Sequence, residues 1–234
     1  MSHCDVHLDK NEGLHKSCVS LVPIFNHLEE EQLNKIMKTT QSVSYQKNEI
    51  IYHAGDKSDS LYIISSGRVR IYRLSASGKE QLVRILNVGD FTGEMALFSE
   101  GIHESYAEAM KDTKICMIKR SDIQDLLLKY PSISLKFLSE FSNRLEESEK
   151  QTTRFSTEQV DTRIALFLVE SLDEADSESL ELTLPMTKKN MASYLGTTPE
   201  TISRKFNELE ERGYIKQLSH KKIKVIDIDG LLLV

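Results

Sequence analysis

The chain has 234 residues, of which 39% are hydrophobic and 28% charged, a composition typical of a globular protein in water. No apolar run reaches the length of about 18 residues that a membrane-spanning helix needs. The first ten residues are polar, unlike a signal peptide. Three cysteines are an odd number and too few for the disulfide framework of a secreted domain. These features predict a cytoplasmic protein without a membrane partner.

The net charge of −6 is unevenly distributed along the chain. Residues 185–234 carry nine Lys and Arg against six Asp and Glu, a net charge of +3, which leaves −9 on the other residues. A basic segment joined to an acidic body is typical of a DNA-binding domain attached to a domain that does not touch DNA. A solvated basic face would give the same asymmetry, so charge alone does not distinguish it from a DNA-binding domain.

The first 130 residues combine a polar arm, a short helix and a series of short strands. Residues 1–20 are polar and rich in His and Cys, which predicts an extended arm, and residues 28–37 predict a helix after the turn at Pro23. Segments rich in β-branched and aromatic residues then recur about every ten residues, separated by turn pairs that contain glycine. This spacing predicts a β-sandwich or barrel-like roll, with strands at 50–52, 61–64, 69–72 and 82–86.

A helical period begins at Pro131. Residues 138, 141, 145, 148, 152 and 155 are three or four positions apart, as in a coiled-coil seam. We expect this helix to join two copies of the chain, and a helix packed on its own domain is the alternative. The expected dimer interface consists of Leu138, Phe141, Leu145 and Phe155. A further apolar helix is expected at 161–172, and the acidic run 170–181, with which it ends, predicts a solvated linker.

The segment 187–212 is the most informative part of the sequence. Thr187 can cap a first short helix, Gly196 supplies a tight turn, and Thr198 can cap a second helix that has Pro199 at its first position. Two short helices joined by such a turn predict a helix-turn-helix, with an ordinary helical hairpin as the alternative. Residues 215–228 predict two strands around 219–221, which would form a basic wing.

The second helix of this motif carries candidate DNA-reading side chains. Glu200, Ser203 and Arg204 lie within about one turn near its N-terminal end, the end that enters a major groove. Arginine can bond guanine at two points, and glutamate can accept a hydrogen bond from cytosine. The remaining expected DNA contacts, mostly to phosphates, are Thr198, Lys188, Lys189, Lys205 and Lys221.

The segment MASYLGTTPETISRKFNELEERGYI resembles the recognition motif of the CRP/FNR superfamily of bacterial transcription regulators, and its Glu-x-x-Ser-Arg spacing resembles the FNR branch. The segments IIYHAGDKSDSLYIISSGRVRIYRL and LNVGDFTGEMALF resemble the β-roll of cyclic-nucleotide-binding domains. The resemblance implies an α+β fold: an arm at 1–20, a β-roll sensor at 21–130, a dimerisation helix at 131–158 and a winged helix-turn-helix at 159–234. It also implies a homodimer on double-stranded DNA, a palindromic target related to TTGAT–N4–ATCAA, and RNA polymerase as a partner.

The resemblance also implies which residues would hold a cyclic nucleotide. Members of this fold that bind one surround the cyclic phosphate with a Glu and a later Arg-Ser pair. Glu94 matches the Glu, but Glu104 stands where the Arg is expected, directly before Ser105. An acid at that position repels an anionic phosphate and removes the two-point arginine clamp. We therefore expect no response to cAMP.

The three cysteines are a second candidate sensor. Cys116 matches the β-roll cysteine of FNR, and Cys18 matches the last of its N-terminal cysteines, whereas the others of that cluster are absent. Cys18 and Cys116 also resemble the pair that forms a reversible disulfide in the FNR-like proteins of lactic acid bacteria. We prefer a redox switch, and cysteines that only pack remain an alternative. The other alternative is an iron–sulfur cluster or zinc held by Cys4, Cys18 and Cys116 with His3, His7 or His15.

Two rival functions belong to other classes. A cyclic-nucleotide-binding signalling module that acts through protein contacts would lack salt-sensitive DNA binding. An enzyme is disfavoured because His53, His103 and His220 lie in separate segments, and no nucleophile elbow, Walker loop or His-Glu-x-x-His motif accompanies them. The sequence therefore predicts a DNA-binding regulator without catalytic residues or a favoured cofactor.

Overall fold

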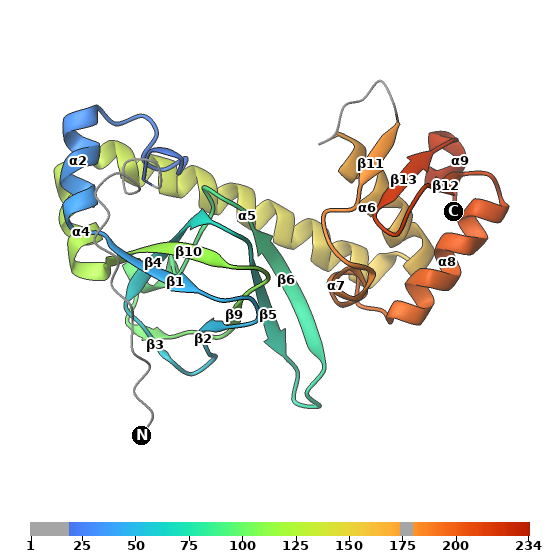
Figure 1. Ribbon diagram of the computed structural model, residues 1–234, viewed down its shortest axis with the longest axis horizontal. Coiled ribbons are helices and arrows are strands. Elements are labelled where there is room, and N and C mark those ends of the chain that lie inside the picture. Colours follow the sequence, from blue (N-terminus) through green and yellow to red (C-terminus); the bar gives the residue numbers. More distant parts are fainter. Residues whose placement is uncertain (1–18, 174–179) are drawn as a thin grey trace. The chain divides into compact units, whose positions relative to one another are not determined.

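The computed structural model describes residues 19–173 and 180–234 (Figure 1). The chain forms two compact units that divide between Arg144 and Leu145, inside the long helix α5 (Pro131–Thr157). The first unit is rich in β-structure, and the second contains short helices around a small sheet. No helix in the described part of the chain combines the length and the apolar character needed to cross a membrane.

The first unit is an antiparallel β-roll with helices before, between and after its strands in the sequence. Two four-stranded sheets have the strand orders β1-β10-β4-β7 and β2-β9-β5-β6, and β3 pairs with β8. Besides the start of α5, the helices are α2 (Glu30–Lys38), α3 (Met95–Phe98) and α4 (Arg120–Lys129). The strands are β1 (Gln41–Tyr45), β2 (Ile50–Tyr52), β3 (Lys57–Ser58), β4 (Ser60–Ser66), β5 (Val69–Leu74), β6 (Glu80–Leu86), β7 (Phe91–Thr92), β8 (Gly101–Ile102), β9 (Tyr106–Ala109) and β10 (Thr113–Lys119).

The four strands expected from sequence are present as β2, β4, β5 and β6. The turn between β4 and β5 shows why glycine is needed there. Gly67 has a φ of +101°, and a Cβ at this position would lie 2.3 Å from Thr113 Oγ1. Helix α2 starts at Glu30 rather than at residue 28, because Gln32 Oε1 accepts from the Glu29 backbone N–H and closes a capping box.

Two hydrophobic cores stabilise the first unit. One lies between the two sheets and includes Tyr52, Ile64 and Val69. The other lies between the β1-β10-β4-β7 sheet and the helices, and includes Cys116 and Val19. Since Val19 is fully buried in this core, Val19 does not belong to the expected arm at 1–20.

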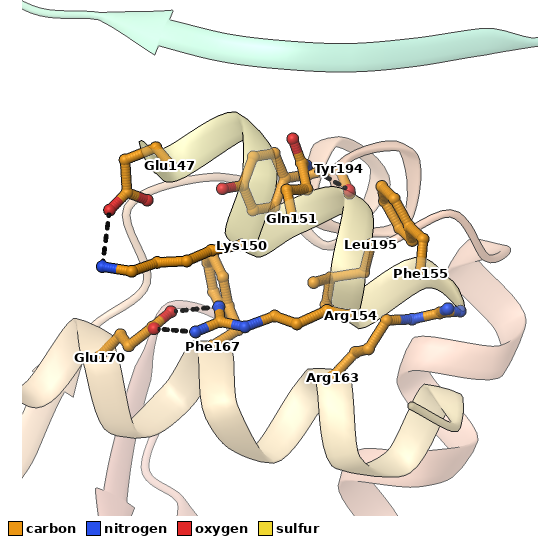
Figure 2. A pocket seen from close by; sticks show the side chains of 10 residues that line it. All are labelled: Glu147, Lys150, Gln151, Arg154, Phe155, Arg163, Phe167, Glu170, Tyr194 and Leu195. Carbon is orange, nitrogen blue, oxygen red and sulfur yellow. Dashed lines mark hydrogen bonds and ion pairs between the residues drawn. The ribbon is translucent and has the colours of Figure 1, made fainter. Parts of the chain in front are cut away.

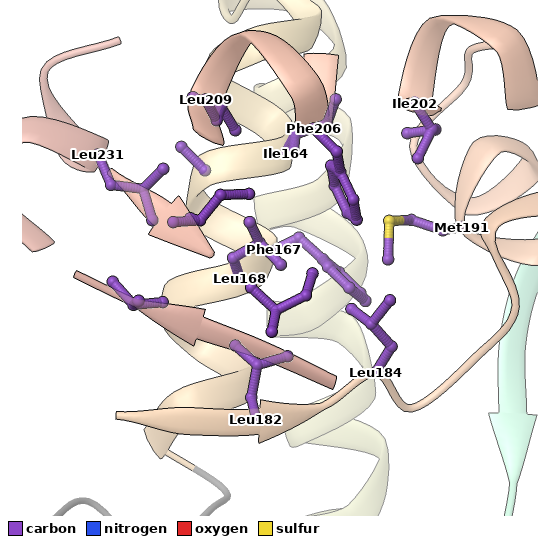
Figure 3. Packing of buried hydrophobic residues seen from close by; sticks show 14 of the residues in the cluster. Ile164, Phe167, Leu168, Leu182, Leu184, Met191, Ile202, Phe206, Leu209 and Leu231 are labelled. Atoms are coloured by element: carbon purple, nitrogen blue, oxygen red, sulfur yellow. The ribbon is translucent and has the colours of Figure 1, made fainter. Parts of the chain in front are cut away.

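The second unit is a winged helix-turn-helix. It contains the C-terminal part of α5 followed by α6 (Val160–Asp173), β11 (Glu181–Thr183), α7 (Lys188–Tyr194), α8 (Pro199–Glu211), β12 (Ile215–Gln217), β13 (Lys222–Val225) and α9 (Ile228–Leu232). A three-stranded antiparallel sheet has the order β11-β13-β12. Figure 3 shows Ile164 and Leu168 of α6 packed with Phe206 of α8 and Leu182 of β11 in one apolar core. The predicted fold class is therefore confirmed: a β-roll, a long helix and a winged helix-turn-helix.

The connection between α6 and β11 is shorter than the linker predicted at 170–181. Helix α6 continues to Asp173, so Glu170 is helical and forms an ion pair with Arg154. Strand β11 begins at Glu181. Residues 174–179 lie outside the described part of the chain.

Candidate nucleic-acid interface

Both helices of the helix-turn-helix, α7 and α8, have the threonine N-caps that the sequence predicts. Thr187 Oγ1 accepts a hydrogen bond from the Asn190 backbone N–H at 3.2 Å, and Thr198 Oγ1 accepts one from Thr201 at 3.2 Å. Each bond satisfies one of the free N–H groups at a helix start. Between the helices Gly196 has a φ of +69°, a left-handed conformation that glycine adopts without a steric penalty. The turn therefore sets the angle at which α8 leaves α7.

Helix α8 has one buried face and one exposed face. Ile202, Phe206 and Leu209 are buried in the core of the second unit. The opposite face begins with Glu200, Ser203 and Arg204, all exposed, followed one turn later by Asn207. A helix anchored on one side and polar on the other can enter a DNA groove without losing its own packing.

Two of the predicted base-reading side chains interact with residues of their own helix or its cap. The Arg204 side chain is 67% exposed, and its Nε lies 3.8 Å from Glu208 Oε1, too far for a hydrogen bond. The pKa of Glu200 is lowered by a hydrogen bond from its own backbone N–H and by one from the Thr198 hydroxyl. Glu200 is therefore an ionised acceptor at neutral pH, as pairing with a cytosine amino group requires.

The predicted lysine contacts separate into two kinds. Lys189 and Lys221 are exposed. Lys205 is tied within the protein, because its Nζ lies 2.7 Å from both Asp161 Oδ2 and Glu208 Oε2. Lys188 is also tied: it lies 4.8 Å from the Phe206 ring centroid, and burial lowers its pKa. Lys205 and Lys188 thus have partners within the protein that help to hold α8 in place, and their assignment to phosphate contacts stays a prediction.

The predicted wing is present as the hairpin of β12 and β13. Its turn contains Lys221, and Lys216 faces Lys224 across the antiparallel pair. Gln217 at the end of β12 makes side-chain hydrogen bonds to both helices of the motif. Sequence reasoning missed Gln217 and Asn207, because neither carries a charge, and their relation depends on β12 folding back onto α8.

The C-terminal part of α5 belongs structurally to the second unit. Figure 2 shows a pocket in which Arg154 forms a two-point ion pair with Glu170. Gln151 Nε2 donates to the Tyr194 carbonyl oxygen at 3.3 Å. Phe155 lines the same pocket and lies against the turn, with its ring 3.0 Å from where a Cβ on Gly196 would stand. Phe155 therefore contacts its own chain, while 37% of it remains exposed.

The other expected seam residues also differ in their surroundings. Leu138 and Leu145 are 63% and 61% exposed, and Leu135 on the same helix face is 70% exposed. Phe141 is half-buried against the core of the first unit, and its ring centroid lies 5.5 Å from that of Phe98. The described part of α5 thus has an outward apolar stripe of Leu135, Leu138 and Leu145, and a second stripe to which Phe141 belongs.

The two candidate sensor residues of the β-roll, Glu94 and Glu104, form separate ion pairs. Glu94 is buried, and its Oε1 lies 2.9 Å from both Arg84 Nη2 and Arg144 Nη1. Burial acts to raise the pKa of Glu94, but the two guanidinium groups outweigh it and hold the pKa below its ordinary value. Glu104 is exposed and pairs with Arg73 at 2.8 Å. A negative charge thus occupies the position where a phosphate-binding arginine would be expected.

Cys116 is buried in the middle of the first sheet. It lies on β10, opposite Ser42 of β1 and Ile63 of β4. Its sulfur is disulfide-bonded. Cys4, Cys18 and the candidate ligands His3, His7 and His15 lie outside the described residues, so the expected redox pair and the alternative metal site stay predictions. Among residues 19–173 and 180–234, no group of three His, Cys, Asp or Glu side chains is placed to hold a metal ion.

Comparisons with known proteins agree with this architecture. Residues 42–130 match the cyclic nucleotide-binding domain, and residues 162–233 match the Crp-like helix-turn-helix domain. The chain is 32% identical to a probable transcriptional regulator, flp, of Lacticaseibacillus casei, over 92% of this chain and 96% of that protein. It is 29% identical to the fumarate and nitrate reduction regulatory protein of Salmonella typhi, over 88% of this chain and 82% of that protein.

The structure of FixK2 from Bradyrhizobium japonicum is similar, with a TM-score of 0.70 and 26% identity over 82% of this chain and 95% of that one. These relatives are regulatory proteins rather than enzymes, and the Crp-like helix-turn-helix domain makes DNA the partner of this chain. From its match along nearly the whole of the flp protein and its two domain matches, the chain belongs to the CRP/FNR family of transcription regulators.

Proposed function

We propose that the protein binds an inverted repeat related to TTGAT–N4–ATCAA as a homodimer, with α8 of each copy in a major groove. The observation that carries this proposal is the exposed polar face of α8, on which Glu200, Ser203 and Arg204 stand above a buried apolar face. In this assignment Arg204 bonds a guanine, Glu200 accepts from a cytosine, and Ser203 fits between them. Lys189 and Lys221, together with the Thr198 cap, supply contacts to the DNA backbone.

A binding titration tests this proposal against the rival signalling module. We expect the protein to bind a duplex with the inverted repeat at least about a thousandfold more tightly than a random duplex of equal length and base composition. We also expect the logarithm of the binding constant to fall linearly as the logarithm of the salt concentration rises, since phosphate contacts release counterions. Equal affinity for both duplexes would refute sequence-specific reading, and no binding at low salt would favour the signalling module.

The dimer of this proposal uses the outward stripe of α5. Leu138 and Leu145, with Leu135, are large apolar side chains exposed on one helix face, as a helix-to-helix contact between two copies requires. Phe141 and Phe155 are left out because both contact their own chain. We propose that residues 21–130 act as the sensor domain, 131–158 as the dimerisation helix and 159–234 as the DNA-binding domain. We also infer that the regulator is cytoplasmic and contacts RNA polymerase.

We further propose that the regulator responds to redox conditions through Cys116 and Cys18, and does not respond to cAMP. The disulfide-bonded state of the buried Cys116 supports the first part. A disulfide that closes a loop of about a hundred residues would stabilise the linked conformation by roughly 4–5 kcal/mol. That free energy is enough to shift the equilibrium between two conformations of a regulator. The acid at Glu104, paired with Arg73, supports the second part.

The redox proposal is tested by comparing diamide-treated and reduced protein on the same inverted repeat. We expect the two states of the wild type to differ in affinity, and Cys18→Ser and Cys116→Ser to abolish the difference. Cys4→Ser is the matched control and should respond as the wild type does. If both Cys18→Ser and Cys116→Ser keep the wild-type response to diamide, this pair is not the switch. Added cAMP should leave the affinity of all four proteins unchanged.

A further inference from the structure

Gln217 connects three elements of the DNA-binding unit through one amide. Its Oε1 accepts from Lys188 Nζ on α7 at 3.0 Å. Its Nε2 donates to Asn207 Oδ1 at 3.1 Å and to Glu210 Oε2 at 2.9 Å, both on α8. Its backbone N–H donates to the other Glu210 oxygen, Oε1, at 2.9 Å. The wing strand β12 is therefore bonded to both helices of the motif.

These partners fix which way the Gln217 amide points. If the amide turned by half a rotation, its NH₂ group would face the Lys188 ammonium and its oxygen would face the Glu210 carboxylate, and both contacts would be repulsive. Hydrogen bonds from Gln217 also hold the pKa of Glu210 below its ordinary value, so Glu210 remains an acceptor. The Gln217 Nε2 donor is thus held toward α8.

The direction of Gln217 in turn determines the direction of Asn207. Asn207 presents its Oδ1 to the Gln217 donor, so its Nδ2 is on the other side of the amide. Within the described residues, no hydrogen bond occupies that Nδ2. Asn207 is exposed on the same face of α8 as Ser203 and Arg204, one turn further from the helix start. An asparagine with both amide groups available can pair with adenine, whereas one whose oxygen is already engaged offers mainly its donors.

We infer that Asn207 donates from Nδ2 to a DNA backbone phosphate, and that Gln217 of the wing is the residue that orients it. The inference rests on the proposed function, because it requires α8 to lie in a groove of DNA. A phosphate is the expected acceptor because side chains near the start of a recognition helix reach base edges, and those further along it approach the backbone. Gln217 is a positioning residue: it acts on DNA through Asn207.

A double-mutant cycle on the intact protein tests the inference. The probes are a duplex with the TTGAT–N4–ATCAA repeat and a random duplex of the same length. We expect Asn207→Ala to weaken binding to both duplexes by a similar factor of about ten, since a hydrogen bond to a charged group is lost. Asn207→Asp should weaken binding more, because it keeps the oxygen but replaces the donor with a negative charge. Asn143→Ala, which changes an exposed helix asparagine in the first unit, is the matched control and should bind as the wild type does.

The coupling between the two residues separates positioning from a general effect on folding. We expect Gln217→Ala to weaken binding about threefold in the wild type and not at all in the Asn207→Ala background. A loss of equal size in both backgrounds would overturn the positioning role, and unchanged affinity of Asn207→Ala would overturn the inference as a whole. A loss confined to the repeat duplex would assign Asn207 to base reading and also overturn it. Those results are separable from failure of the proposed function, in which the wild type itself would not prefer the repeat.

Discussion

The ionic cluster around Glu94 allows a prediction of stability with an internal control. Only about 10% of the Glu94 side chain is exposed, and its Oε1 contacts two guanidinium groups at 2.9 Å. Glu94→Gln keeps the shape of the side chain but leaves Arg84 and Arg144 partly buried without their counter-charge. Removing one partner of a buried ion pair costs about 3–5 kcal/mol. For a chain of this size we expect the melting temperature to fall by roughly 10 °C.

The matched control is Glu31→Gln on α2. Glu31 also contacts a cation, Lys35 Nζ at 2.6 Å, but 80% of its side chain is exposed. Because solvent screens such a pair, this variant should melt with the wild type. Scanning calorimetry of the three proteins at pH 7 gives the comparison. If Glu94→Gln and Glu31→Gln melt within about one degree of each other, the cluster around Glu94 does not stabilise the first unit and the reasoning is wrong.

The same cluster predicts a dependence of stability on pH. The pKa of Glu94 is lower in the folded protein than its ordinary value, so the folded state binds its proton less readily than the unfolded state does. The stabilisation from Glu94 is therefore complete above the ordinary carboxyl pKa and is lost as the pH falls through the lowered value. Below that pH, wild type and Glu94→Gln should approach the same melting temperature. A difference between them that stays constant from neutral to acidic pH would contradict the assigned charge state of Glu94.

Three further predictions concern DNA reading, assembly and the turn. Arg204→Ala should cost roughly 1–3 kcal/mol on the repeat duplex and relax the preference at one guanine, whereas Lys189→Ala should weaken binding to all sequences alike; equal losses on specific and random DNA for both variants would refute the division of roles. The double variant Leu138→Lys and Leu145→Lys should sediment as a monomer and lose binding to the repeat, and a variant that stays dimeric would remove these leucines from the interface. Gly196→Ala should destabilise the protein by about 1–2 kcal/mol in urea unfolding, because a Cβ makes the left-handed conformation at φ +69° unfavourable for alanine; an unchanged midpoint would contradict this.

The parts of the fold that sequence reasoning predicted are those determined by near neighbours. Thr198 caps a helix through a bond to a residue three positions away, and Gly196 forms the turn by its own conformation. Strands β5 and β6 are rich in β-branched residues and lie on either side of a glycine turn. Strand β1 was missed because its sequence, QSVSY, has a single aliphatic residue, and it becomes a strand by pairing with β10, which is distant in sequence.

The roles that could not be predicted depend on partners distant in the sequence. Lys205 forms an ion pair with Asp161, which is 44 residues away, and Lys188 donates a hydrogen bond to Gln217, which is 29 residues away. No local pattern distinguishes such lysines from Lys189, which is exposed. Phe141 illustrates the same difficulty on a helix. Its spacing from Leu138 fits a seam, but the periodicity does not tell which of two apolar stripes faces the helix's own domain.

The order of strands in the wing sheet has a consequence for how the protein is made. Strand β11 precedes helices α7 and α8 in the chain, and its partner β13 follows them, with Leu182 opposite Ile223. A ribosome releases the N-terminal part of a chain first, so the β-roll is free to fold while β13 has yet to emerge. Until then β11 has no strand to pair with, and the helices between the two strands are not enclosed. Nascent chains stalled before residue 222 should therefore contain a folded β-roll but should not bind the inverted repeat. DNA binding is thus acquired later in synthesis than the fold of the sensor domain.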